Sequence, residues 1–119
     1  MNIQIINPID TLDWDALIRT VDGATFFHTS AWARVLSESY GYTPLYFTAI
    51  ENSKLSGLIP VMEIRSFLTG KRGVSLPFSD MCEPLADDQD FDALLKQAVA
   101  HGRKAGWRHI ELRGGGSFL

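Results

Sequence analysis

Three segments of the chain carry apolar residues at the spacing of an amphipathic helix. In each of them, apolar side chains recur every three or four residues and would line one face of a helix. Short polar residues stand before these segments and glycines stand after them, as helix caps do. The predicted helices begin after Asp10, after Thr29 or Ser30, and after Asp88 or Asp90, and they end at Gly23, Gly41 and Gly106.

The same spacing predicts which side chains the two longer helices bury. Buried residues should share one stripe of the helix, with polar residues on the opposite stripe. For the helix after residue 29, the expected buried residues are Trp32, Val35, Leu36 and Tyr40. For the last helix, which should pack against the sheet, they are Phe91, Leu94, Leu95, Ala98 and Val99.

Between the helices, short segments rich in β-branched and aromatic residues indicate strands. A turn at residues 51–54 should join two of them as a hairpin, and residues 69–73 should form the next turn. Pro60 cannot donate a backbone hydrogen bond, so its strand should be bulged or exposed there. The predicted strands are Asn2–Ile6, Pro44–Ile50, Leu55–Ile64, Val74–Phe78 and Arg108–Arg113.

The resulting order of elements is β-α-α-β-β-β-α-β. Three consecutive strands should pair antiparallel, whereas the final β-α-β step should pair in parallel. We therefore expect an α/β (α+β) fold with a mixed, mostly antiparallel sheet flanked by helices. One domain spanning residues 1–113 accounts for every element, and the glycine-rich residues 114–119 should form a flexible tail.

Composition and charge narrow the range of functions. With 119 residues, of which 45% are hydrophobic and 21% charged, the chain resembles one soluble globular domain. Its net charge of −3 argues against general binding of nucleic acid or of anionic membranes. No segment approaches the roughly 20 apolar residues of a membrane helix, and the N-terminus lacks the pattern of a signal peptide. We expect a cytoplasmic protein without a membrane span.

Few residues suit metal or nucleophilic chemistry. Cys82 is the single cysteine, so an internal disulfide and a multi-cysteine zinc site are excluded. His101, on the expected polar side of the last helix, and His109 have no neighbours at the spacing of metal ligands. His28 and Glu63 are candidates for a general base, but a structural role is favoured for both. We predict no metal site and assign no catalytic residue.

A compact basic cluster is the best candidate for binding an anion. Arg65, Lys71 and Arg72 surround a glycine turn and would suit a phosphate or carboxylate of a sugar-nucleotide or peptide acceptor. The alternative is that they are solvated charges of a hairpin. Trp32 similarly admits two interpretations, contact with a sugar or packing between helix and sheet.

The predicted order of elements is the same as that of the first eight elements of the GNAT fold of N-acyltransferases. In GNAT enzymes that use acyl-CoA, backbone N–H groups before the third helix hold the pyrophosphate. The corresponding residues 79–90 contain no glycine and five acidic residues, which would repel phosphates. We therefore expect no coenzyme A and no other cofactor.

Four short segments of the sequence share their order with a known family: Phe27–Trp32, Gly57–Val61, Ser75–Asp80 and Glu83–Asp87. In that order they resemble the N-terminal half of FemAB-like proteins. These proteins are aminoacyltransferases built from two GNAT-like units, and they add amino acids from aminoacyl-tRNA to the peptide of peptidoglycan precursors. Relatives are associated with exopolysaccharide and cell-surface systems.

The resemblance implies a binding site for the acceptor substrate. Asp87 matches an acidic residue that ends a Gly-Pro-x-x-Asp segment beside the acceptor cleft, although Glu83 stands where that glycine is found. Asp80, in the motif just before it, is a further candidate. The donor site and most of the transfer chemistry belong to the second unit of the family. Because this chain lacks that unit, we expect a fragment or reduced relative that is not catalytic alone.

The leading hypothesis is therefore the acceptor-side domain of a FemAB-type aminoacyl or acyl transferase. Its expected partners are a peptidoglycan or polysaccharide precursor and, through a second unit, aminoacyl-tRNA. The alternatives are a stand-alone acyl-CoA N-acetyltransferase and a protein–protein interaction domain completed by a partner strand. The last predicted strand would expose an unpaired edge, so a homodimer is a further expectation.

The acidic residues 79–90 lead to a direct test. Acetyl-CoA should not bind, because carboxylates stand where its phosphates would need N–H donors. Isothermal titration calorimetry measures this. A dissociation constant below about 100 μM would contradict the expectation and favour the acyl-CoA enzyme.

Overall fold

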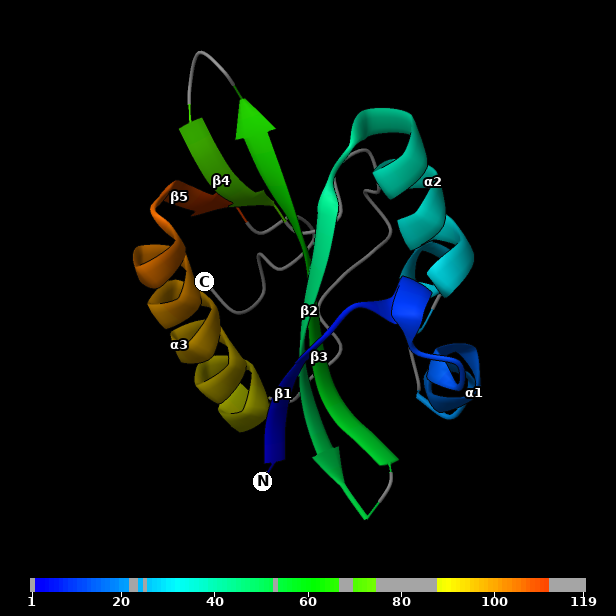
Figure 1. Cartoon of the computed structure of the whole chain (residues 1–119). Coiled ribbons are helices and arrows are strands. Elements are labelled where there is room, and N and C mark those ends of the chain that lie inside the picture. Colours follow the sequence, from blue (N-terminus) through cyan, green and yellow to red (C-terminus); the bar gives the residue numbers. More distant parts are fainter. Residues whose placement is uncertain are drawn as a thin grey trace.

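A twisted five-stranded sheet forms the centre of the computed structural model, with helices on both of its faces (Figure 1). The structure describes residues 2–21, 24, 26–52, 54–66, 70–74 and 88–111. Two 3-10 helices, Pro8–Asp10 and Phe26–His28, precede the first two α-helices. The helices are α1 (Trp14–Arg19), α2 (Ser30–Tyr40) and α3 (Asp88–Ala105), and the strands are β1 (Asn2–Ile6), β2 (Thr43–Glu51), β3 (Lys54–Ser66), β4 (Gly70–Val74) and β5 (Trp107–Glu111).

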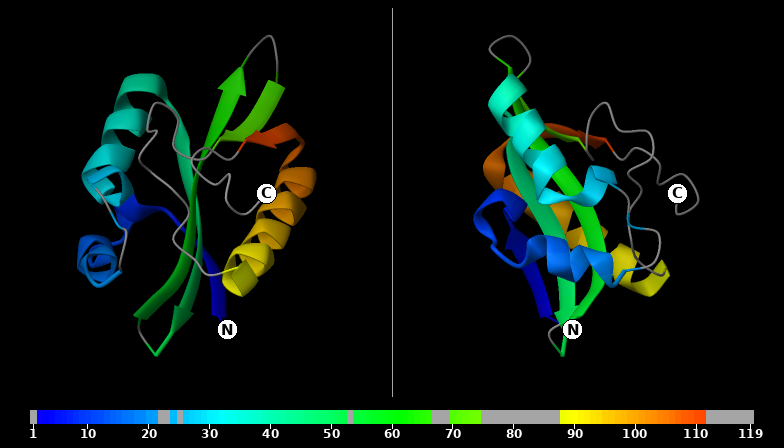
Figure 2. Two further views of the ribbon diagram at one scale, coloured as in Figure 1. Left: turned by 180° about the vertical axis from the view of Figure 1, so that it is seen from behind. Right: turned by 90° about the vertical axis from the view of Figure 1, so that its right-hand side faces the viewer.

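Strands that follow one another in the chain are also neighbours in the sheet, in the order β1-β2-β3-β4-β5. The first four pair antiparallel, whereas β4 and β5 pair in parallel because α3 returns the chain between them. Helices α1 and α2 lie on one side of the sheet and α3 lies on the other (Figure 2). The mixed, mostly antiparallel sheet flanked by helices confirms the predicted fold class.

Alternation along β2 and β3 divides the buried side chains between two cores. The core under α3 confirms the predicted face of that helix, with Phe91, Leu94 and Ala98 buried and Leu95 partly buried against it. Strand residues Phe47, Ala49, Ile59 and Val61 complete this core. The core under α1 and α2 contains Trp14, Ile18, Ala33, Leu36, Tyr46, Leu55, Leu58 and Met62.

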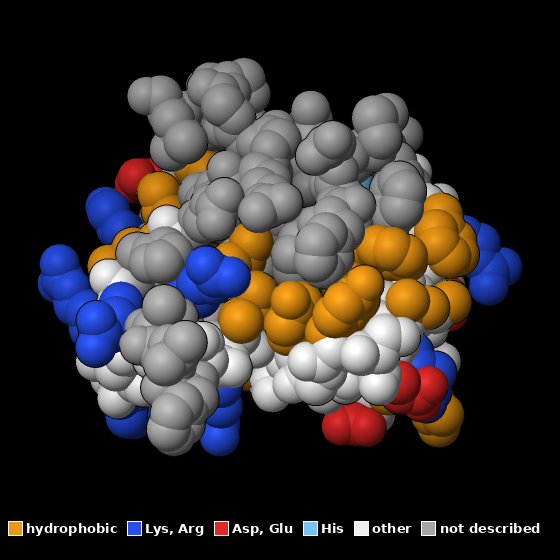
Figure 3. Space-filling view, turned by 90° about the horizontal axis from the view of Figure 1, so that it is seen from above, with side chains coloured by type: hydrophobic (Ala, Val, Ile, Leu, Met, Phe, Trp, Pro, Cys, Tyr) orange, Lys and Arg blue, Asp and Glu red, His pale blue; other side chains and the backbone are white. Residues whose placement is uncertain are grey.

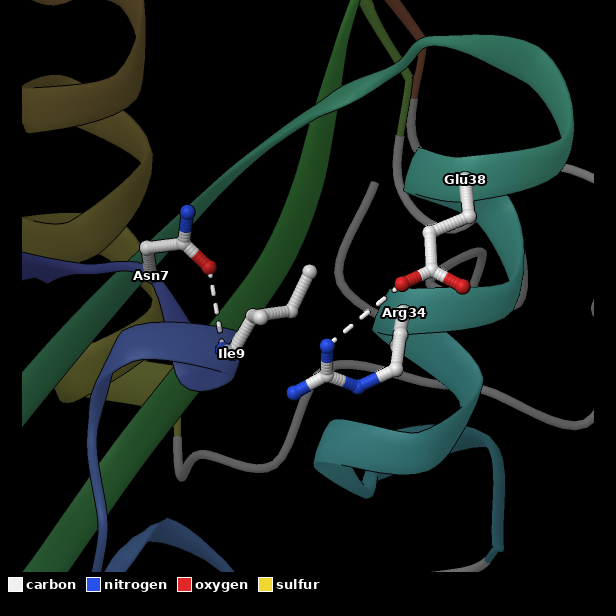
Figure 4. Close-up of polar contacts among 4 residues, drawn as sticks. All are labelled: Asn7, Ile9, Arg34 and Glu38. Carbon is white, nitrogen blue, oxygen red and sulfur yellow. Dashed lines mark hydrogen bonds and ion pairs between the residues drawn. The ribbon is translucent and has the colours of Figure 1, made fainter.

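The first predicted helix is divided into a 3-10 helix and α1. The side-chain Oδ1 of Asn7 accepts a hydrogen bond from the N–H of Ile9 at 3.0 Å and so begins a separate helical turn (Figure 4). Asp10 lies inside that turn and is not the N-cap of α1, a position that Asp13 holds. The predicted end at Gly23 lies outside the described residues.

Helix α2 has the predicted caps but a different buried face. Its N-cap is Thr29, and Gly41 ends it with a φ of 72°, a left-handed conformation that favours glycine. Ala33 and Leu36 are fully buried, whereas Val35 is 43% exposed and Tyr40 56% exposed. The small side chain at position 33 lets this side of the helix approach the core closely. The predicted burial of Val35 and Tyr40 is therefore wrong.

The expectation for Pro60 is also wrong. Pro60 is buried within β3 and pairs with Tyr46 of β2, while the register shift lies between Ala49 and Ile50 of β2. The described pairs of β3 with β4 involve Met62–Ser66. The missing N–H of Pro60 interrupts none of the described pairs between β3 and β4.

Most of the turn predicted at residues 69–73 belongs to β4. Gly70–Val74 pair with Met62–Ser66 of β3, so the chain has already reversed before residue 70. Glycine and charged residues are uncommon in strands. Because these residues are mostly of those types, the sequence did not predict a strand here. Most of the strand predicted at 74–78, and the whole tail at 114–119, lie outside the described residues.

Trp107 is wedged between β4 and α3 immediately after the end of that helix. Gly106 ends α3 with a φ of 82°, and Trp107 begins β5. The indole lies against Gly73 of β4 and Gly102 of α3. A Cβ atom added to Gly73 would lie 2.4 Å from the ring, and one added to Gly102 would lie 2.6 Å from it. Neither position has room for a side chain.

A row of aromatic rings continues from this wedge under α3. The ring of His101 meets that of Trp107 edge-on at 5.4 Å and that of Phe47 edge-on at 5.8 Å. His101 therefore faces the sheet and does not lie on the polar side of the helix, as the sequence pattern had suggested.

Replacing Gly102 with alanine should destabilise the protein, although alanine is the better helix former. At an exposed helical site, this change adds about 1 kcal/mol of stability. Here the new methyl group would overlap the indole of Trp107, and we expect a net loss of about 1–3 kcal/mol, as for an overpacked core. Urea unfolding followed by circular dichroism measures the change.

The control is Ala100→Gly at an exposed position of the same helix. It should cost about 1 kcal/mol through helix propensity alone. A Gly102→Ala variant that is as stable as the wild type would contradict the close packing of Trp107.

Candidate functional site

Glu63 is a buried carboxylate where β3, β4 and β5 meet. It follows Val61 on the face of β3 that is turned toward α3, and only 6% of the residue is exposed. Its Oε2 accepts a hydrogen bond from Nε1 of Trp107 at 2.8 Å. Its Oε1 accepts a hydrogen bond from Nε of Arg65 at 3.2 Å. Both oxygens thus have partners, as a buried charge requires.

Burial raises the pKa of Glu63, but the surrounding groups outweigh that effect. The hydrogen bonds from Trp107 and Arg65 lower the pKa, and so do the positive charges of Arg65 and Lys71. The net pKa lies below the ordinary value of 4.5, so the group is ionised at neutral pH. A general base for neutral pH needs a raised pKa, and this environment therefore favours the structural role of Glu63.

The sheet separates the three residues of the predicted basic cluster. Arg65 of β3 pairs with Lys71 of β4, and successive residues of a strand point to opposite faces. Arg65 and Lys71 therefore share the face that carries Glu63 and α3, whereas Arg72 lies on the other face. The cluster is compact along the chain, but it does not form one surface.

Arg72 carries a buried donor without an acceptor. Its Nε atom is buried and has no hydrogen-bond partner among the described residues. Arg108 of β5 extends across Gly70, where an added Cβ atom would lie 3.0 Å from the Nε atom of Arg108. Gly70 and Arg72 are two residues apart on β4 and share a face. Two arginine side chains therefore border the same end of the sheet.

Positive charge concentrates at this end of the molecule. Seen from above, Lys and Arg side chains gather on the side that holds β4, β5 and the end of α3 (Figure 3). The net charge of the chain as a whole is −3, so the described cations are unevenly distributed over the molecule. Such a surface attracts anionic ligands. The cations that these elements and the end of β3 contribute are Arg65, Lys71, Arg72, Arg103, Lys104 and Arg108.

The other residues singled out in the sequence lie elsewhere. Trp32 is half-buried on α2 against the core, and its ring centroid is 6.1 Å from that of Phe26, which favours the packing role. His28 is fully buried, and its backbone carbonyl accepts a hydrogen bond from Nε1 of Trp14 at 2.9 Å. Asp80 and Asp87 lie outside the described residues.

The sequence analysis did not single out Trp107 or Arg108. In the structure, Trp107 contacts Gly73, Gly102 and Glu63, and Arg108 lies across Gly70. A signal was present, because Gly73 and Gly102 interrupt a strand and a helix. Glycine inside such an element often marks the close approach of another group. The identity of that group depends on how α3 crosses the sheet, which no local pattern shows.

Other classes of site were also sought. Within the described ranges, no three His, Cys, Asp or Glu residues gather where they could hold a metal ion. Among the helices that the structure describes, none combines the length and the apolar character needed to cross a membrane. Comparison of the chain with protein-family models, curated proteins and solved structures found no match. The resemblance to FemAB-like proteins stays a prediction from the sequence motifs.

Glu63→Gln should destabilise the protein at neutral pH and reduce its sensitivity to acid. A carboxylate with a depressed folded pKa stabilises the fold above its unfolded pKa, and this contribution disappears as the pH falls through the folded pKa. At about pH 7 the wild type should have the larger free energy of unfolding, because Glu63 is fully ionised. At about pH 3 the difference between wild type and variant should be small. Urea unfolding at both pH values measures it.

Glu38→Gln is the matched control, because Glu38 is exposed and pairs with Arg34 on the same helix at 3.5 Å (Figure 4). It should change stability by less than about 0.5 kcal/mol at either pH. A deficit for Glu63→Gln that is equal at both pH values would show that the charge of Glu63 is not its source.

Proposed function

We propose that the chain is the acceptor-side domain of a FemAB-type aminoacyl or acyl transferase and that it binds an anionic peptidoglycan or polysaccharide precursor. The four sequence segments similar to this family support the proposal. The mixed sheet with helices on both faces is compatible with a GNAT-like unit. Fold alone does not determine function, so the proposal depends on the chemistry of the site.

The buried Nε of Arg72 is the observation that carries this proposal. A buried donor that lacks an acceptor costs about 1–3 kcal/mol, and an anionic oxygen of a ligand would remove that cost. A guanidinium group also offers several donors in one plane, which suits a phosphate or a carboxylate. We assign Arg72 to a phosphate or carboxylate of the acceptor.

The remaining candidate residues take different roles in this proposal. Arg65 forms an ion pair with the buried Glu63, so its role is to stabilise the fold and not to bind the acceptor. Lys71 adds positive charge from the opposite face and strengthens the attraction of anions. Asp80 and Asp87 would border the acceptor, as the family resemblance implies.

The domain would bind and orient the acceptor, while a second unit would hold the aminoacyl-tRNA donor. No described residue is assigned to the transfer step. Residues of the second unit would then supply the chemistry, and this chain would increase the rate by positioning the acceptor amine.

Calorimetric titration with a nucleotide-linked muramoyl pentapeptide tests the proposal. This soluble peptidoglycan precursor carries both phosphates and carboxylates. We expect saturable binding by the wild type and at least about tenfold weaker binding by Arg72→Gln, because a charge-assisted hydrogen bond is lost.

Arg34→Gln is the control for the change in net charge, since Arg34 is an exposed residue of α2 paired with Glu38. It should bind the precursor like the wild type. Equal weakening by both variants would show that binding depends only on net charge, and the absence of saturable binding would contradict the proposed function.

A further inference from the structure

Strand β5 has a bulge opposite Arg72 of β4. The residue pairs on either side of it are Lys71 with Trp107 and Gly73 with Ile110. One residue thus separates the two pairs on β4, whereas two residues separate them on β5, which is the pattern of a β-bulge. The bulge therefore places the residue that follows Trp107 next to Arg72.

That residue is Arg108, and its side chain lies on the same face of the sheet as Arg72. Trp107 packs against the core under α3, whereas the side chain of Arg108 extends across Gly70 on the opposite face. Gly70 and Arg72 are two residues apart on β4, so they share this face. Because Gly70 has no side chain, the Nε of Arg108 can lie 3.0 Å from the position of a Cβ atom there. Two arginine side chains from neighbouring strands thus occupy one region of this face.

Neither arginine has a partner for its charge in the described part of the chain. Arg72 and Arg108 form no ion pair with a described residue, and the buried Nε of Arg72 has no acceptor there. The carboxylate of Glu63 lies on the other face, where it binds Trp107 and Arg65. Like charges on facing residues of neighbouring strands destabilise a sheet. An anion held between the two guanidinium groups would relieve this repulsion and supply the missing acceptor.

We propose that Arg72 and Arg108 together bind the phosphate portion of the acceptor. Two guanidinium groups carry two positive charges, which a phosphate dianion or a diphosphate link matches and a single carboxylate does not. Phosphate oxygens point in several directions, so arginines from two strands can donate hydrogen bonds to different oxygens. The two oxygens of a carboxylate lie in one plane and match one guanidinium fork.

This inference rests on the proposed function and adds two things to it. It makes Arg108 a second binding residue of the site. It also decides between the two groups that Arg72 alone could bind, in favour of the phosphate.

Titration with methyl phosphate tests the site, with malonate as the charge-matched carboxylate ligand. At about pH 7 both ligands are mainly dianions, so they differ in geometry more than in charge. Binding is followed by the NMR signals of the backbone amides of β4 and β5 and of the Nε–H group of Arg72. We expect methyl phosphate to saturate these shifts with a dissociation constant below about 5 mM, and malonate to bind at least about tenfold more weakly.

Variants test whether the two arginines act together. Arg72→Gln and Arg108→Gln should each weaken binding of methyl phosphate at least about tenfold, because each removes one charged donor. Arg103→Gln is the matched control, since it removes the same charge from an exposed position of α3 on the other face of the sheet. It should bind methyl phosphate like the wild type. Circular dichroism shows whether each variant is folded, and Arg108 is itself exposed, so its replacement removes no buried contact.

Equal affinity of the wild type for methyl phosphate and malonate would overturn the inference. So would an Arg108→Gln variant that binds methyl phosphate like the wild type. The comparison of ligands uses the unchanged protein, so it decides the question even where a variant fails to fold.

Titration of the same variants with the nucleotide-linked muramoyl pentapeptide separates this inference from the proposed function. If Arg72→Gln weakens binding of the precursor and Arg108→Gln does not, the proposed function stands and the shared phosphate site is rejected. If methyl phosphate binding depends on both arginines and the precursor does not bind, the phosphate site stands and the proposed function is rejected.

Discussion

The contact on which this end of the molecule depends is the wedge of Trp107 between β4 and α3. Its indole occupies the space that side chains at Gly73 and Gly102 would need, and its Nε1 donates a hydrogen bond to the buried Glu63. This one side chain therefore links β3, β4, β5 and α3. Dense packing around a buried, charged hydrogen-bond partner tolerates little displacement, so the position of α3 over the sheet follows from it.

Glu63, the hydrogen-bond partner of Trp107, also determines which of the nearby cations is paired. Glu63 must be paired because it is buried, and Arg65 supplies that pairing. Arg72 lies on the opposite face, where its buried Nε has no described acceptor. Arg108 follows Trp107 in β5, and its side chain extends across Gly70 of β4. Glu63 thus engages Arg65, whereas the Nε of Arg72 on the other face has no described acceptor.

The sequence pattern failed where tertiary contacts override local preference. Residues 70–73 have the composition of a turn, yet pairing with β3 holds them in a strand. Val35 has the right spacing for burial, but the small Ala33 brings the adjacent side of α2 to the core. His101 has a polar ring, yet the rings of Phe47 and Trp107 hold it against the sheet. For the strand and for His101, a partner distant in the chain decides the outcome.

The sequence by itself determined the class of fold, the caps of α2 at Thr29 and Gly41, and the buried stripe of α3, because periodicity and capping are local properties. It also identified Arg65, Lys71 and Arg72 as candidate anion ligands. Only the tertiary structure decided that the sheet separates them and that Glu63 meets Trp107. Those two residues are 44 positions apart, and their contact exists only because α3 crosses the sheet and places β5 beside β4.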